Sequence, residues 1–217
     1  MEKSCDTLDA LPFKLHDFGY RGVSCDEQAG IGGAMHLIHF RGSDTFAAVD
    51  HIFEFYSDDV MPTFSIPASE HFTMTIWGRN GEENAFDNML EKFPNGNVAC
   101  VSDTYDIFKA CGDLWGIKLK DKILAREGTL VIRPDSGDPL YVIPKVLQIL
   151  WDRFGGTVNT KGFKVLDSHV RIIQGDGIDF LSIGALCEKV IACGFSLDNI
   201  FFGSGGGLLQ KWNRDTY

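Results

Sequence analysis

Short apolar runs alternate with amphipathic segments along most of this chain, and this alternation limits the possible fold more than any other property. β-branched runs are typical of buried strands, and apolar residues at helical spacing after each run predict a helix. The expected strands are 36–40, 98–101, 130–132, 170–173 and 199–202; the expected helices are 45–56, 107–115, 140–154, 180–193 and one from 208. Such alternation predicts an α/β fold, a parallel sheet with helices packed on it. An open doubly wound sheet and a closed α/β barrel both fit.

Each expected strand ends in a short polar cluster. In both architectures the carboxyl ends of the strands form the ligand-binding face. Such residues also cap helices and make turns, and for a single cluster that interpretation is favoured. Because the pattern recurs at five strand ends, we expect a shared polar site. Its members are Asp44, Ser102, Asp106, Arg133, Asp135, Asp176 and Asp179.

The charge of the chain narrows the class of ligand. Its 217 residues include 20 Lys and Arg against 30 Asp and Glu, which gives a net charge of −10. Nucleic acids and anionic membranes are recognised through an excess of basic residues, so we expect neither as a partner. Individual phosphates can still be bound by a few arginines, backbone N–H groups and a metal ion.

The cysteines and the first residues of the chain indicate the cellular compartment that we expect. None of the 6 cysteines forms a Cys-x-x-Cys pair or a zinc-binding spacing. The first residues lack the apolar core of a signal peptide, and no segment reaches the ~18 apolar residues of a membrane span. We therefore expect buried, reduced thiols in a cytoplasmic protein with no membrane segment.

Two motifs suit a ligand that carries hydroxyls and phosphates. The run 203–207, Gly-Ser-Gly-Gly-Gly, lies between a strand and a helix, where backbone N–H groups can surround an anion. It matches neither a Walker A loop nor Gly-x-Gly-x-x-Gly, and the alternative is a tight turn. Arg133 and Asp135 place a cation and a carboxylate two residues apart, which suits phosphate oxygens, sugar hydroxyls or Mg²⁺. The alternative is an ion pair within the chain.

Two histidine-containing segments also carry candidate functional groups. The loop 16–22 combines His, Asp, two aromatic residues and Arg, which suits ring stacking and phosphate binding. His71 follows Ser69-Glu70, and on the residues alone a packed histidine is favoured over a catalytic one.

Four segments carry a resemblance to a known family: 11–23, 132–137, 173–177 and 202–211. They resemble the nicotinamide phosphoribosyltransferases, which are type II phosphoribosyltransferases, in the same order and from about Leu11 to Asp215. The resemblance implies an irregular α/β barrel that forms nicotinamide mononucleotide and pyrophosphate from nicotinamide and phosphoribosyl pyrophosphate. It further implies Mg²⁺, ATP as a co-substrate that phosphorylates a histidine, and a homodimer with the active site at the subunit interface.

The resemblance also implies a role for individual residues. For nicotinamide these are Phe18, Asp44 and Arg133. For the phosphoribosyl and pyrophosphate groups they are Arg21, Ser102, Asp106, Asp135, Gly175, Asp176, Gly205, Gly206 and Arg214. The implied catalytic residues are His71, the phosphorylated histidine, with Asp135 and Arg133; Asp135 is also the implied metal ligand. The carboxylate of Asp44 can accept an amide N–H but repels the carboxylate of nicotinate, which favours the amide substrate.

The resembling enzymes continue before Leu11 and after Arg214. We therefore expect residues 1–10 to be an unmatched leader and 11–217 to be a partial barrel core that lacks the family's two ends. Two alternatives stay open. One is a nicotinate-type phosphoribosyltransferase, against which Asp44 argues. The other is a catalytically silent fragment that binds phosphoribosyl ligands or dimerises.

Overall fold

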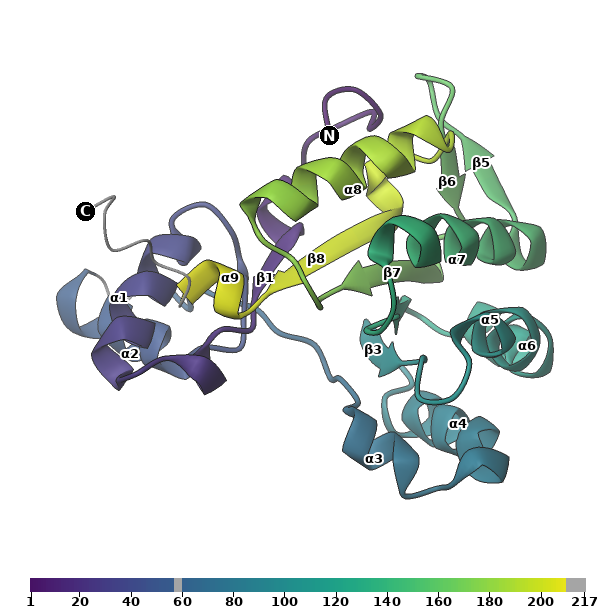
Figure 1. Cartoon of the computed structure of the whole chain (residues 1–217), viewed down its shortest axis with the longest axis horizontal. Helices are drawn as coiled ribbons and strands as arrows, with labels where there is room; N and C mark the ends of the chain where they lie inside the picture. Colours follow the sequence, from purple (N-terminus) through teal and green to yellow (C-terminus); the bar gives the residue numbers. More distant parts are fainter. Residues whose placement is uncertain (57–59, 210–217) are drawn as a thin grey trace. The chain divides into compact units, whose positions relative to one another are not determined.

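The computed structural model describes residues 1–56 and 60–209 (Figure 1). The chain divides into two compact units, each assembled from separate stretches of sequence. Unit 1 comprises residues 1–7, 66–174 and 185–200, and unit 2 comprises 8–65, 175–184 and 201–217. Each unit contains parallel strands with helices beside them, which confirms the α/β expectation.

Unit 1 is built on parallel strands in the order β7-β4-β3. Their bounds are Val98–Val101 for β3, Leu130–Arg133 for β4 and Val170–Gln174 for β7. Every residue of β3 and β4 is buried, which explains why these strands are continuous apolar runs. Val101 lies opposite Arg133 in the register, so β3 and β4 end at the same edge of the sheet.

The helices of unit 1 are α3 His71–Thr75, α4 Glu82–Lys92, α5 Ile107–Lys109, α6 Lys120–Leu124 and α7 Pro139–Phe154, with short 3-10 turns at Arg79–Gly81 and Leu197–Asn199. Two of these helices were expected, those at 107–115 and 140–154, and α3, α4 and α6 were not. α8, Phe180–Ala192, starts among residues of unit 2 and ends in unit 1. The segment Ala110–Lys118 is a π-helix, so the expected helix at 107–115 is helical but wider than an α-helix over most of its length.

A hairpin corrects one expectation for unit 1. No strand was expected between the helix at 140–154 and the strand at 170–173. In the structure, the exposed strand β5, Gly156–Val158, pairs antiparallel with β6, Lys164–Leu166. Gly156 permits this pairing because a Cβ there would lie 2.0 Å from the backbone oxygen of Val165. The hairpin was missed because β5 is exposed and lacks an apolar run.

Unit 2 is smaller and carries parallel strands in the order β2-β1-β8. The strands are β1 Leu15–Asp17, β2 Gly42–Ser43 and β8 Ile200–Ser204, the last belonging to unit 2 from residue 201. The helices are α1 Asp26–Leu37, α2 Phe46–Phe55 and α9 Gly206–Leu209, with 3-10 turns at Leu11–Phe13 and Tyr20–Gly22. α1 packs against α2 (Figure 1).

The expected strand at 36–40 is wrong. His36 and Leu37 form the end of α1, and the strand of this region is β2, at residues 42–43. The close packing of α1 on α2 explains the helix, because a Cβ on Gly33 would lie only 2.6 Å from the Cβ of Ala48. The five residues 36–40, His-Leu-Ile-His-Phe, fit either structure, because the period of so short a stretch does not distinguish a strand from a helix.

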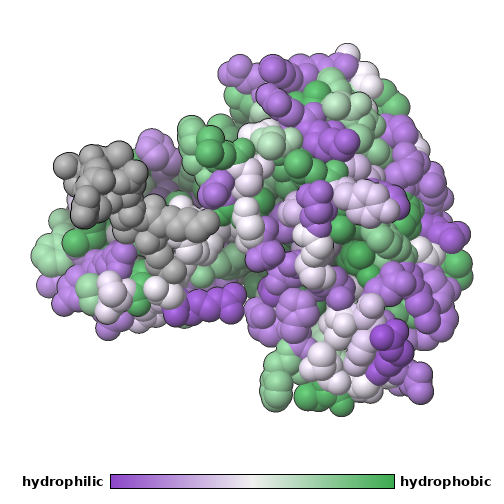
Figure 2. Space-filling model, viewed as in Figure 1, coloured by the Kyte–Doolittle hydropathy of each residue, from purple (hydrophilic) through white to green (hydrophobic). Residues whose placement is uncertain are grey.

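Among residues 1–56 and 60–209, no helix combines the length and the hydropathy needed to cross a membrane. The six cysteines are all free; Cys5, Cys100 and Cys111 are buried, whereas Cys25 and Cys193 are exposed. Apolar side chains gather at the surface over α3, at the lower end of the view in Figure 2. They are Phe72, Ile76 and Trp77, of which Phe72 is 75% exposed.

Candidate active site

His71 lies beside two carboxylates in unit 1. Its Nε2 is 2.9 Å from Oδ1 of Asp103, and its Nδ1 is 3.9 Å from Oδ2 of Asp135. The histidine side chain is 43% exposed, whereas that of Asp103 is only 2% exposed. The imidazole is therefore held through one nitrogen by a buried carboxylate, and the ring remains accessible to a ligand.

Asp103 also fixes the loop that follows β4. Its second oxygen, Oδ2, accepts a hydrogen bond from the backbone N–H of Asp135 at 3.1 Å. A buried carboxylate with both oxygens bonded orients His71 and the Asp135 backbone together. Asp103 was not among the predicted site residues, although it directly follows Ser102 at the end of β3. Its position in the strand-end cluster was the available signal.

Arg133 connects the end of β4 to the start of α3. Its guanidinium donates to both carboxylate oxygens of Glu70, at 3.3 and 3.2 Å, and to Oδ2 of Asp135 at 3.4 Å. Burial acts to lower the pKa of Arg133, but the hydrogen bonds with Glu70 and the nearby carboxylate charges outweigh it, so the pKa is raised. Since Glu70 directly precedes His71, this ion pair also fixes the start of the helix that carries the histidine. The sequence analysis noted Glu70 only as a neighbour of His71.

Two residues of unit 1 that were predicted to contact a ligand form hydrogen bonds within the protein. The buried hydroxyl of Ser102 donates to the backbone oxygen of Cys100 and accepts from the indole N–H of Trp115, each at 3.0 Å. Oδ1 of Asp106 caps α5 by accepting from two backbone N–H groups, each at 3.0 Å. Capping, the alternative interpretation, therefore describes Asp106 in this structure, and its contact with a ligand stays a prediction.

Phe18 follows β1 in unit 2, and its ring lies against the glycine of a neighbouring strand. A Cβ on Gly203 of β8 would come within 1.9 Å of Cε2 of Phe18, so only glycine leaves room for the ring. The ring centroid is 4.7 Å from that of His16, with 39° between the planes. The half-buried Phe18 ring is thus held in position by the strands on which it rests.

Asp44 lies just past β2 and is tied to β1. Its backbone N–H donates to the oxygen of Asp17 at 3.0 Å. Its Oδ1 accepts from Ser65 Oγ at 2.5 Å and lies 2.9 Å from His16 Nε2. The side chain is 49% exposed, so the carboxylate is both oriented and accessible. Because the His16 ring also contacts the Phe18 ring, an aromatic surface and an oriented carboxylate occur together in unit 2.

The glycine run 203–207 does not form a left-handed turn, because no glycine in it has a positive φ. Its glycines instead permit close packing. A Cβ on Gly207 would lie 2.6 Å from the backbone oxygen of Ile178, and one on Gly205 would lie 3.4 Å from that of Phe18. Gly206 is the first residue of the four-residue helix α9. Whether Gly205 and Gly206 hold a phosphate stays a prediction.

The remaining predicted residues of unit 2 lie in loops. Gly175 and Asp176 follow β7, and Arg21 is exposed within the 3-10 turn at 20–22. Asp179 accepts from the backbone N–H groups of Leu181 and Ser182, at 3.0 and 2.9 Å, at the start of α8. Arg214 lies outside the described residues.

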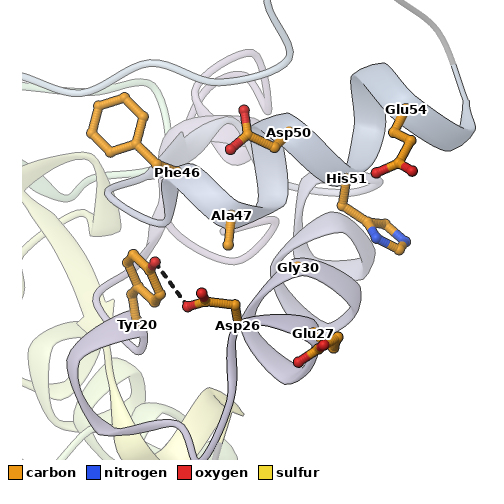
Figure 3. Close-up of a pocket in the computed structure, with 9 residues that line it drawn as sticks. All are labelled: Tyr20, Asp26, Glu27, Gly30, Phe46, Ala47, Asp50, His51 and Glu54. Carbon is orange, nitrogen blue, oxygen red and sulfur yellow. Dashed lines mark hydrogen bonds between the residues drawn. The ribbon is translucent and has the colours of Figure 1, made fainter.

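A pocket of about 230 Å³ opens between α1 and α2 within unit 2 (Figure 3). Four carboxylates line it, on Asp26, Glu27, Asp50 and Glu54, together with His51 and the rings of Tyr20 and Phe46. The hydroxyl of Tyr20 donates to Asp26 at 3.0 Å (Figure 3). So many carboxylates repel phosphate groups, and none of the predicted site residues lines this pocket.

Comparison with solved structures defines the class to which the fold belongs. A nicotinate phosphoribosyltransferase of Saccharomyces cerevisiae matches 99% of this chain and 49% of its own, with a TM-score of 0.63 and 15% identity. That of Porphyromonas gingivalis matches 95% of this chain and 48% of its own, with a TM-score of 0.56 and 15% identity. The fold is therefore the irregular α/β barrel of type II phosphoribosyltransferases, represented in part, as the sequence resemblance implied.

The chain belongs to the nicotinate phosphoribosyltransferase (NAPRTase) family, whose model matches residues 13–217. Among curated relatives, a nicotinamide phosphoribosyltransferase of Xanthomonas campestris is 51% identical over 215 residues, which are 98% of this chain and 46% of the relative. One from Mycoplasma pneumoniae is 36% identical in an alignment of 227 positions that covers 99% of this chain and 48% of the relative. The chain thus spans about half the length of the curated relatives it matches.

Proposed function

We propose that this chain transfers the phosphoribosyl group of phosphoribosyl pyrophosphate to nicotinamide, giving nicotinamide mononucleotide and pyrophosphate for NAD salvage. The observation that carries the proposal is the oriented carboxylate of Asp44, hydrogen-bonded to the histidine whose ring contacts that of Phe18. The 51% identity to a nicotinamide phosphoribosyltransferase supports it.

Nicotinamide recognition is assigned to unit 2. The Phe18 ring offers a flat surface for the pyridine ring, and Asp44 accepts an N–H of the carboxamide. A nicotinate carboxylate in the same place would face a second negative charge. Nicotinate is nevertheless the second candidate substrate, because the family model and both solved structures carry its name.

Phosphoribosyl binding is assigned chiefly to unit 1. As the bond at the anomeric carbon breaks, positive charge develops on the sugar and pyrophosphate leaves with the electron pair; the pyridine nitrogen then forms the new bond. Arg133 neutralises negative charge of the ligand, and we assign Asp135 to the ribose hydroxyls. The further contacts proposed are with Arg21, Ser102, Asp106, Gly175, Asp176, Gly205, Gly206 and Arg214.

Mg²⁺ is the metal we propose for the phosphates. The described residues contain no group of three or more side chains placed to hold a metal. Mg²⁺ commonly uses only one or two carboxylates, with phosphates and water as its other ligands. Asp135 fits that requirement, and the excess of carboxylates around the single guanidinium of Arg133 favours a cation when pyrophosphate binds. When bound, the ion would neutralise the leaving group.

ATP is the co-substrate we propose for His71. An imidazole nitrogen can take the terminal phosphoryl group of ATP, releasing ADP. The hydrogen bond from His71 to the buried carboxylate of Asp103 supports this role, because it fixes the ring while the side chain stays 43% exposed.

A homodimer with the active site at its interface is likewise proposed. The exposed apolar side chains Phe72, Ile76 and Trp77 on and after α3 support an association surface next to His71. The six free cysteines support a cytoplasmic location, since thiols persist in a reducing compartment.

The deciding experiment incubates the purified chain with phosphoribosyl pyrophosphate, Mg²⁺ and either nicotinamide or nicotinate, with and without ATP, and quantifies both mononucleotides. We expect the amide product to predominate and ATP to raise its yield. Asp44→Asn is the matched variant. Its amide can donate as well as accept, so we expect the preference for nicotinamide to fall by roughly tenfold or more.

Two results would overturn the proposal. Equal or preferential use of nicotinate would assign the chain to the nicotinate-type enzymes. No product from a chain shown to be folded would favour the silent fragment, an alternative supported by the 46% coverage of the Xanthomonas relative.

A further inference from the structure

One oxygen of Asp44 is the meeting point of three separate segments of unit 2. His16 comes from β1, Asp44 follows β2, and Ser65 lies 21 residues further along the chain. Both His16 Nε2 and Ser65 Oγ converge on Oδ1, at 2.9 and 2.5 Å. We call His16 and Ser65 the Asp44 clamp.

The serine of the clamp is held by backbone contacts. The preceding residue, Phe64, forms a parallel bridge with Gly42 of β2. Its N–H donates to Arg41 O at 2.7 Å, and its oxygen accepts from Ser43 N at 3.3 Å. Ser65 is therefore attached to the same strand that leads into Asp44, which fixes the distance between hydroxyl and carboxylate.

The histidine of the clamp is held by its opposite residue and by an aromatic neighbour. His16 pairs with Gly42 in the β1–β2 register, and a Cβ on Gly42 would lie 2.6 Å from His16 Nδ1. Only glycine at position 42 leaves the ring this space. The His16 ring also contacts the Phe18 ring in a tilted arrangement, and the His16 side chain is just 15% exposed.

Ser65 donates its hydroxyl hydrogen to Oδ1, and His16 can donate from Nε2 to the same oxygen, so an ionised carboxylate satisfies both contacts. The clamp thereby presents a charged, preoriented group to a ligand stacked on Phe18. Orientation before binding lowers the entropy cost of recognising an amide, and the charge disfavours an acid. We propose that Ser65 and His16, acting through Asp44, are positioning residues that set the preference for nicotinamide over nicotinate; this inference rests on the proposed function.

The test measures equilibrium binding of nicotinamide and nicotinate to the 217-residue chain by calorimetry, and expresses preference as the ratio of the two dissociation constants. In Ser65→Ala we expect the preference for the amide to fall by roughly tenfold, the lower end of the effect of losing one hydrogen bond to a charged group. Ser65→Thr keeps the hydroxyl and should keep the preference. Gly42→Ala, which displaces the His16 ring without removing it, should lower the preference like Ser65→Ala.

His39→Ala is the matched control, because His39 is an exposed histidine of the same unit and should leave the ratio unchanged. The inference is overturned if Ser65→Ala and Gly42→Ala both retain the wild-type ratio, or if the wild-type chain does not prefer the amide. Mononucleotide formation is assayed on the same samples. An intact preference that depends on the clamp, without any product, would refute the proposed activity and leave the clamp standing. Product formation with a ratio of dissociation constants that the clamp variants leave unchanged would support the proposed activity and refute the role of the Asp44 clamp.

Discussion

The imidazole of His71 is hydrogen-bonded through Nε2, whereas Nδ1 lies 3.9 Å from Asp135 Oδ2, and this difference decides which nitrogen is available to react. Nε2 is 2.9 Å from Oδ1 of Asp103, so Nε2 carries the proton that the carboxylate accepts. Nδ1 then holds the lone pair. If ATP phosphorylates His71, we expect the phosphoryl group on Nδ1. NMR of ¹⁵N-labelled protein after incubation with ATP distinguishes the two isomers.

Asp103→Ala provides the companion variant. Without its carboxylate the ring loses its fixed tautomer, and phosphoryl incorporation should fall by roughly tenfold to a hundredfold, as when an orienting carboxylate is removed from a metal-binding histidine. Wild-type protein phosphorylated at Nε2 would contradict the assignment, because that nitrogen would then have to give up its contact with Asp103.

At the scale of single residues, sequence patterns identified groups at strand ends but not their partners. Arg133 and Asp135 stood out because charged residues directly follow a buried strand. Asp103 and Ser65 did not, since each acts on a residue that is distant in sequence: Asp103 lies 32 positions from His71, and Ser65 lies 21 from Asp44. Such contacts arise only when the sheet brings its loops together, and no local pattern encodes them.

At the scale of elements, the expected structure was right where burial was complete. β3 and β4 are buried along their whole length, and α7 shows a continuous apolar face. In these segments the period of the apolar residues and the residue types predict the same element. The expectation was wrong at 36–40, where small residues of α1 allow close helix packing, and it missed the exposed hairpin of β5 and β6. Patterns of hydrophobicity report burial, and they lose their information where a strand is short or exposed.

The contact between β8 and Phe18 provides a test at this scale. In Gly203→Ala, the new Cβ would lie 1.9 Å from Cε2 of Phe18, so the ring must move off the strand. We expect nicotinamide binding to weaken by roughly tenfold or more, with a loss of unfolding free energy of about 1–3 kcal/mol. Calorimetric titration and thermal unfolding measure the two effects.

Gly184→Ala is the matched control for that change. Gly184 lies within α8, and no atom lies within 4 Å of the position of its Cβ. Alanine there should leave nicotinamide binding unchanged and stabilise the helix by about 0.5–1 kcal/mol. Unaltered binding in Gly203→Ala would show that the Phe18 ring does not hold the nicotinamide.

At the scale of the whole molecule, the division into units was not predictable from composition. The sequence was expected to form an unmatched leader at 1–10 and one core at 11–217. In the structure residues 1–7 belong to unit 1, where Ser4 and Cys5 are buried. Asn159 donates to the oxygen of Ser4 at 2.7 Å. Because each unit is assembled from stretches far apart in the chain, no linker marks a boundary.

This division predicts where each ligand protects the backbone. Nicotinamide should slow amide hydrogen exchange in peptides of unit 2 that contain Asp44 and Ser65, because Asp44 and the Asp44 clamp lie in that unit. Phosphoribosyl pyrophosphate with Mg²⁺ should instead slow exchange around His71 and Arg133 in unit 1. At a ligand concentration of about a hundred times the dissociation constant, binding stabilises the folded state by roughly 2.7 kcal/mol, and mass spectrometry can detect the slower exchange that results.

Asp44→Asn serves as the control, since it should weaken protection by nicotinamide and leave protection by phosphoribosyl pyrophosphate unchanged. Protection by nicotinamide confined to unit 1 would contradict the assignment of ring recognition to Phe18 and Asp44.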